Sequence, residues 1–114
     1  MAKDYKALIK DISEYTKELR DVIPDTMNGF YSMSKAATAD GLLDKKIKEF
    51  IALAIGVTQR CDGCIGFHIK ALKKMGATRE EIAEVLGMCV YMGGGPTLMY
   101  AADTLRAYDQ FSEE

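Results

Sequence analysis

The sequence predicts an all-α protein of about six helices. Apolar residues recur at three- and four-residue steps along most of the chain, which is the spacing of an amphipathic helix. No segment of the sequence shows the strict alternation, bounded by turn residues, that predicts a β-hairpin. With 114 residues, 48% of them hydrophobic, the chain is sized for a single core. We therefore expect one domain over residues 1–114.

Two helices are predicted at the start of the chain. The first is marked by an apolar stripe made of Tyr5, Leu8, Ile9, Ile12, Tyr15, Leu19 and Val22. Pro24 breaks this stripe and suits the first turn of a second helix, expected over residues 25–39. Asp40 and Gly41 follow as the residues that end it.

The third and fourth helices are predicted around the middle of the chain. Asp44 is the expected N-cap of the third, which runs to about Thr58. Residues 50–57 carry no charge on any face, so we expect this helix to be buried in the core or between subunits. The fourth helix is expected to start near Cys61 and to end at Gly76, which suits the left-handed conformation after a helix C-terminus.

Two further helices, joined by a glycine-rich turn, are predicted in the last third of the chain. Thr78 and Glu81 have the spacing of a capping box for the fifth helix. Three glycines at residues 93–95 precede Pro96, which suits the first turn of a sixth helix. The uncharged residues 85–102 border on the length of a membrane span, but this turn interrupts them. We interpret them as two buried helices and expect no membrane partner.

Charge and cysteine content narrow the classes of function. Fifteen basic and seventeen acidic residues give a net charge of −2, so we expect no nucleic-acid partner. The N-terminal segment is polar and mixed in charge, unlike a secretion signal. Three cysteines, two of them three positions apart, favour a functional dithiol in a reducing compartment over a secreted disulfide framework. We expect a cytoplasmic protein.

The segment most informative about function is Cys61-Asp62-Gly63-Cys64-Ile65-Gly66-Phe67-His68. Thiols three positions apart on a helix share one face and are close enough to form a disulfide. His68 follows Cys64 by one turn on that face, where an imidazole can take the proton of a thiol. The helix N-terminus also favours a thiolate, because its free N–H groups and dipole attract anions. We interpret the chain as a small thiol–disulfide redox enzyme.

Other interpretations of the same residues stay open. The cysteine pair with His68 and Glu49 could form a four-ligand zinc site, although structural zinc sites usually draw ligands from separate segments. His68 could be a core histidine, and Glu49 a solvated helix residue. Glu49 precedes the uncharged residues 50–57, so we expect its side chain to be partly buried and to need a partner, for which His68 is the candidate. Cys89 stands in an apolar stripe and is expected to be an inert core residue.

Four residues together carry a resemblance to a known family: Glu49, Cys61, Cys64 and His68. Their order and spacing resemble the Glu…Cys-x-x-Cys-x-x-x-His signature of alkyl hydroperoxidase D-like proteins, which belong to the carboxymuconolactone decarboxylase family. The likeness covers residues 42–108 and includes the glycine-rich turn at residues 92–96. One departure is Gly63, where some members carry a second histidine between the cysteines.

The resemblance implies an all-helical bundle whose short members assemble into homotrimers or homohexamers. It implies a dithiol that cycles with its disulfide and reduces peroxides or the disulfide of a partner. The catalytic residues that it implies are Cys61, Cys64, His68 and Glu49. The dithiol cycle also requires an unidentified thiol reductant protein as partner, and we expect no cofactor and no metal. The decarboxylase branch lacks the cysteine pair, so the cysteines argue against decarboxylation.

We therefore predict a cofactor-free peroxidase or disulfide reductase with an antioxidant role. Glu49 would orient His68 and raise its basicity. His68 would take the proton of Cys64, and Cys61 would be the outer thiol that meets partners. The order of the cysteines stays open, because Cys61 is nearer the helix N-terminus. The alternatives are an acid–base enzyme of the decarboxylase type, or a non-catalytic oligomeric binding or metal-site module.

Overall fold

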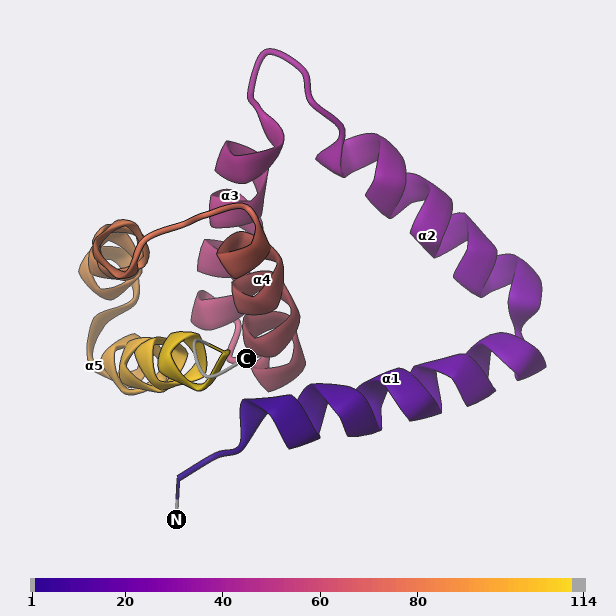
Figure 1. Cartoon of the computed structure of the whole chain (residues 1–114), viewed down its shortest axis with the longest axis horizontal. Helices are drawn as coiled ribbons and strands as arrows, with labels where there is room; N and C mark the ends of the chain where they lie inside the picture. The colour runs from indigo at the N-terminus through magenta and orange to yellow at the C-terminus, as the bar shows by residue number, and fades with distance from the viewer. Residues whose placement is uncertain (1, 112–114) are drawn as a thin grey trace.

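The structure, a computed structural model that describes residues 2–111, is all-α as predicted. Its helices within that range are α1 (Tyr5–Val22), α2 (Pro24–Thr38), α3 (Lys45–Thr58), α4 (Asp62–Lys74) and α5 (Arg79–Phe111). Figure 1 shows α3, α4 and α5 gathered on one side of the molecule, while α1 and α2 extend from them as two arms that meet at their far ends. The first turns of α1 lie against α4, so the core is built at that end.

The predicted helix ends are confirmed where capping side chains define them. The Asp44 carboxylate accepts a hydrogen bond from the Ile47 N–H at 2.8 Å, as an N-cap does. Thr78 and Glu81 make the reciprocal pair of bonds of a capping box, each side chain accepting from the other residue's N–H. The Thr78 N–H and the Lys46 ammonium lower the pKa of the Glu81 carboxyl below its usual range.

The two helices predicted in the last third of the chain are both present, and five elements result because these two join at the glycine-rich turn. The fifth and sixth predicted helices form one element, α5, which is bent at Gly94. Gly94 adopts a φ of 73° and a ψ of −157°, a backbone conformation open almost only to glycine. Figure 1 shows that the segments of α5 before and after the bend run in different directions. The turn itself lies where the glycines predicted it.

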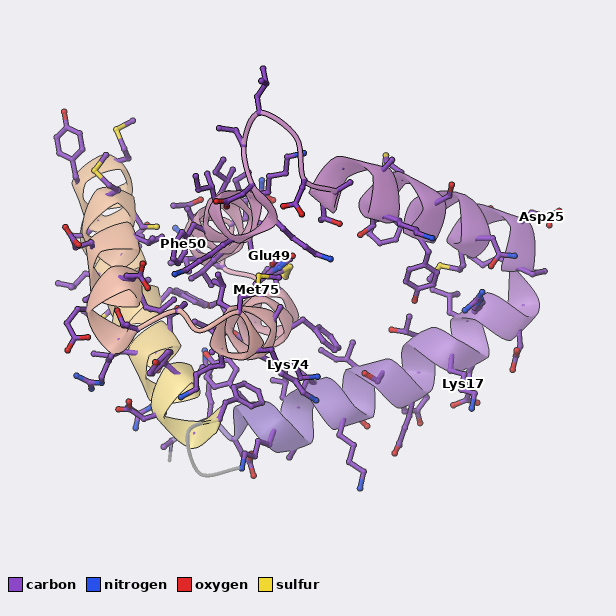
Figure 2. All side chains as sticks on the ribbon, turned by 45° about the horizontal axis from the view of Figure 1, so that its top comes forward. Lys17, Asp25, Glu49, Phe50, Lys74 and Met75 are labelled. Atoms are coloured by element: carbon purple, nitrogen blue, oxygen red, sulfur yellow. A yellow bond between two sulfur atoms is a disulfide. The ribbon has the colours of Figure 1, made fainter. Side chains whose placement is uncertain are left out.

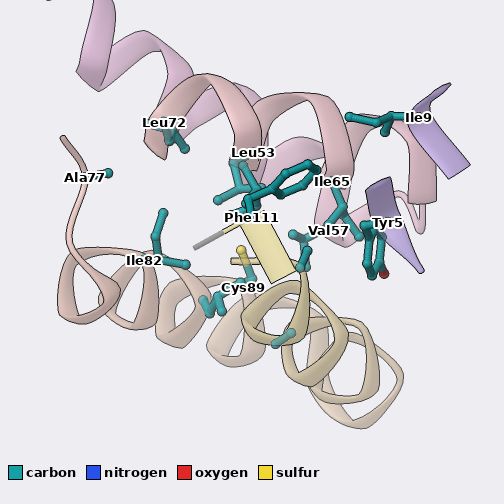
Figure 3. Packing of buried hydrophobic residues seen from close by; sticks show 14 residues of the cluster. Tyr5, Ile9, Leu53, Val57, Ile65, Leu72, Ala77, Ile82, Cys89 and Phe111 are labelled. Atoms are coloured by element: carbon teal, nitrogen blue, oxygen red, sulfur yellow. The ribbon is translucent and has the colours of Figure 1, made fainter. Parts of the chain in front are cut away.

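The core lies where α3, α4 and α5 meet the start of α1 (Figure 3). Its fully buried large side chains are Tyr5, Leu53, Val57, Ile65, Ile69, Leu72, Ile82 and Thr104. Gly66 of α4 lets α1 approach closely, because a β-carbon at that position would meet the Ile9 Cγ2 atom. On α1, only Tyr5 and Ile9 are buried, and α2 has no buried residue. The arms therefore contribute little to the core of the single chain.

Two of the segments expected to be buried are only partly buried in the single chain. On α3, Ile51 and Ile55 are 47% and 52% exposed, so the uncharged residues 50–57 bury one face only. On α5, exposed apolar side chains flank the bend at Met88, Tyr91, Met92, Leu98 and Met99. Within the described residues, α5 is also the one helix that is long and apolar enough to cross a membrane. One such helix is weak evidence for a membrane span, because core helices of soluble proteins meet the same criterion. Burial of these faces between subunits stays a prediction.

Candidate functional site

Helices α3 and α4 come into close contact at the cysteine pair. Gly56 of α3 is buried, and a β-carbon on it would lie 2.9 Å from the Cβ atom of Cys64. Real Cβ contacts are not that short, so only glycine allows the two helices to approach this closely. The sequence analysis did not single out Gly56, because its partner lies on another helix.

Cys61 and Cys64 form a disulfide at the N-terminus of α4, with Cα atoms 5.2 Å apart. Cys61 is the N-cap of the helix, and its Sγ atom accepts a hydrogen bond from the Cys64 N–H at 3.1 Å. Both cysteines are half-buried, which leaves the disulfide open to a small reagent or a partner thiol. A sulfur in this position would keep the same N–H donor when it is a thiolate.

His68 and Glu49, expected to be partners, are brought together across α4 and α3. The Nδ1 atom of His68 lies 2.7 Å from Oε2 of Glu49, and the Glu49 residue is only 7% exposed. A carboxylate accepts hydrogen bonds, so it favours the imidazole tautomer with the proton on Nδ1. The lone pair of the neutral ring is then on Nε2. In the view of Figure 2, Glu49 and the disulfide project onto the same place between α3 and α4.

The four residues therefore form one compact arrangement. Cys64 and His68 are four residues apart on α4, which places them one above the other on the same face. Glu49 fixes the ring from α3. A half-exposed disulfide next to a carboxylate-oriented imidazole can exchange with external thiols and can move a proton at the sulfur that is released.

Gly63, the departure from the histidine of some relatives, has a packing reason in this chain. A β-carbon at this position would lie 2.9 Å from the Cδ1 atom of Ile12. The Ile12 side chain of α1 thus occupies the space into which a side chain would extend. A second histidine between the cysteines would require the end of the Ile12 side chain to move.

Lys3 is a site neighbour that the sequence analysis missed. Its ammonium lies 3.0 Å from the carboxylates of both Asp62, between the cysteines, and Asp103 on α5. It also lies 4.7 Å from the centre of the Tyr100 ring. The acidic Asp62 can pair with a cation, but 59 residues separate it from Lys3 in the sequence. Nothing local in the sequence could have identified Lys3.

Cys89 is buried, as expected, and belongs to the core. Burial raises the pKa of its thiol, which keeps it in the unreactive protonated form. For the zinc interpretation, residues 2–111 contain no group of three or more His, Cys, Asp or Glu side chains placed to hold a metal ion.

We expect Gly56→Ala to destabilise the protein by about 1–3 kcal/mol, because the added methyl group would push α3 away from Cys64. Gly87→Ala is the matched control: Gly87 lies on α5 with no atom within 4 Å of its would-be β-carbon. That change should stabilise the helix by about 0.5–1 kcal/mol. Urea unfolding of both variants measures the difference. Equal effects would contradict the close contact at Cys64.

Comparison with known proteins places this arrangement in a family. The carboxymuconolactone decarboxylase family model matches residues 24–107. A protein of Cupriavidus necator of uncharacterised function is 40% identical over 109 residues, which is 96% of each chain. An uncharacterised protein encoded in the cox locus of Paracoccus denitrificans is 35% identical over 83 residues, 73% of this chain and 75% of its own.

Solved structures agree in fold. A carboxymuconolactone decarboxylase family protein from Legionella pneumophila superimposes with a TM-score of 0.93 at 54% identity, covering 95% of this chain and 96% of its own. A family member from Thermotoga maritima, whose description suggests a part in the antioxidative response, gives a TM-score of 0.79 at 26% identity. That match covers 90% of this chain and 91% of its own. The chain belongs to the carboxymuconolactone decarboxylase family.

Proposed function

We propose that the protein is a thiol-dependent oxidoreductase of the alkyl hydroperoxidase D-like kind, which reduces peroxides or small disulfides in the cytoplasm. The observation that carries the proposal is the half-exposed Cys61–Cys64 disulfide on the same helix as His68, which Glu49 holds at 2.7 Å. The antioxidative role suggested for the relative from Thermotoga maritima supports it.

In the reductive half of the cycle, a dithiol reductant protein opens the disulfide. Its thiolate attacks the Sγ atom of Cys61, the outer sulfur, and the Cys61–Cys64 bond breaks. His68 accepts the proton that the attacking thiol of the reductant loses, and passes it to Cys64, which leaves as a thiolate. The second thiol of the reductant then releases Cys61 as a thiol. Two electrons pass from the reductant to the protein.

In the oxidative half, the neutral imidazole of His68 takes the proton of the Cys64 thiol. The thiolate attacks the terminal peroxide oxygen, the O–O bond breaks, and the alkoxide leaves as an alcohol after taking the proton from the His68 imidazolium. The resulting sulfenic acid on Cys64 is attacked by Cys61, which releases water and restores the disulfide. The peroxide gains two electrons, and the two thiols lose them. A small disulfide can replace the peroxide as the electrophile.

A peroxide challenge of the fully reduced protein tests the proposal. We expect the wild type to lose two thiols per chain without forming cross-linked chains, because the two sulfurs pair with each other. Cys61→Ser should stop at a sulfenic acid on Cys64, and Cys64→Ser should lose the rapid reaction. Thiol titration, non-reducing electrophoresis and a sulfenic-acid probe measure these outcomes.

The double variant Cys61→Ser/Cys64→Ser separates this proposal from the acid–base alternative. A decarboxylase-type enzyme that uses Glu49 and His68 would keep its activity without the cysteines. Loss of turnover in the double variant, with the fold intact by circular dichroism, supports the dithiol cycle. Full turnover in that variant would contradict it.

A further inference from the structure

Several contacts hold a cation of the N-terminal segment at Asp62, the residue that follows Cys61. The Gln110 side chain fixes this segment: its Nε2 donates to the Lys3 carbonyl at 2.6 Å, and its Oε1 accepts from the Tyr5 N–H at 2.8 Å. The Lys3 ammonium is thereby placed between Asp62 and Asp103, at 3.0 Å from each. Partial burial opposes its charge, but the hydrogen bonds to both carboxylates outweigh this and raise the pKa of Lys3.

The position of Asp62 makes its charge matter for the cysteines. It is the first residue of α4 and directly follows Cys61, so the two Cα atoms are about 3.8 Å apart. The side chains of adjacent residues stay within the screening length of about 10 Å at 0.1 M salt, so a charged Asp62 carboxylate disfavours a thiolate on Cys61. Within the described residues, Lys3 is the ion-pair partner of Asp62. Asp103 has a second cation, because Arg106 lies 3.8 Å from it.

We propose that Lys3 is a positioning residue for the redox reaction: by pairing with Asp62 it cancels the carboxylate between the cysteines and keeps the reduced site easy to ionise. The inference rests on the proposed dithiol function and adds a residue that the Glu49–His68 pair does not explain. Loss of Lys3 leaves Asp62 as an uncompensated negative charge next to Cys61. The thiolate then becomes harder to form, and the thiol less reactive at neutral pH.

The other ionisable groups around the pair stay the same in every variant compared. They are Tyr5 on α1, Glu49 on α3, His68 on α4, Tyr100, Asp103 and Arg106 on α5, and Arg60 before Cys61. Burial raises the pKa of Tyr5 to about 12, so its hydroxyl is neutral across the range of the assay. Differences between variants therefore report the Lys3 and Asp62 charges.

The test is the pH dependence of iodoacetamide alkylation of the reduced protein, followed for Cys61 and Cys64 by mass spectrometry. We expect Lys3→Gln to raise the midpoint of alkylation by roughly 0.5–1 pH unit at low salt. Asp62→Asn should lower it by a similar amount. The double variant Lys3→Gln/Asp62→Asn should return to about the wild-type midpoint, and Lys3→Arg should keep it. In 1 M salt, where screening extends only about 3 Å, the Lys3→Gln shift should shrink.

Lys10→Gln is the matched control, since it removes the same charge from an exposed position on α1 outside this cluster, and it should leave the midpoint unchanged. A purely structural role of Lys3 predicts that the Lys3→Gln shift persists in the double variant and in high salt. That result, or no shift at all, would overturn the inference. Because alkylation needs no turnover, a normal shift without turnover of peroxides or small disulfides would overturn the proposed function alone.

Discussion

His68→Ala is expected to slow the peroxide-driven loss of the Cys61 and Cys64 thiols by about 100-fold at pH 7. A positioned general base contributes about 10²–10⁴-fold to a proton-transfer step. His68 is the imidazole one turn from Cys64 on α4, and its Nδ1 atom is held by Glu49. Without the ring, formation of the thiolate depends on solvent. Stopped-flow thiol titration after a peroxide pulse measures the rate.

The pH profile distinguishes loss of a base from loss of the fold. A free cysteine thiol ionises near pH 8.5 without help. The His68→Ala rate should therefore rise steeply with pH and approach the wild-type rate above about pH 9. Lys74→Ala, an exposed change at the far end of α4, is the control and should behave as wild type. Equal rates for wild type and His68→Ala at pH 7 would rule out the base assignment.

Glu49→Gln should lower the same rate by about 10-fold, within the 10–100-fold range seen when a partner that orients a functional histidine is removed. The amide is the same size as the carboxylate but neutral. It neither stabilises an imidazolium nor selects the tautomer with Nε2 free. The Glu49 residue is 7% exposed and its Oε2 atom lies 2.7 Å from His68, so solvent cannot replace it. The assay is the thiol loss used for His68→Ala.

A double-mutant cycle shows whether Glu49 acts through His68. In the His68→Ala background, Glu49→Gln should cost less than about 2-fold, because the group that it orients is already absent. An undiminished 10-fold loss in that background would mean that Glu49 acts on the cysteines by another route. Circular dichroism and urea unfolding of each variant exclude loss of the fold as the cause.

Much of the fold could be predicted, because its signals are local. Asp44, the Thr78–Glu81 box and Gly76 each act on the helix end next to them, and the structure has helix ends at all three places. The bend at Gly94 was also local, because only glycine readily adopts its φ of 73°. The differences between prediction and structure concern which apolar side chains are buried within the single chain. Ile51 and Ile55 are apolar but exposed in the single chain, and composition cannot say which neighbour covers a face.

The candidate site likewise has features that the local sequence sets and features that helix packing sets. The sequence by itself determined that Cys64 and His68 share one face of a helix with Cys61 at its N-terminus, because residues four apart on a helix are neighbours whatever surrounds them. Only the tertiary structure decided the rest: Glu49 meets His68 from 19 residues away, and Lys3 meets Asp62 from 59 residues away. The close approach of Gly56 to Cys64 was also decided by the tertiary structure. These contacts depend on how the helices pack, which no local pattern of residues specifies.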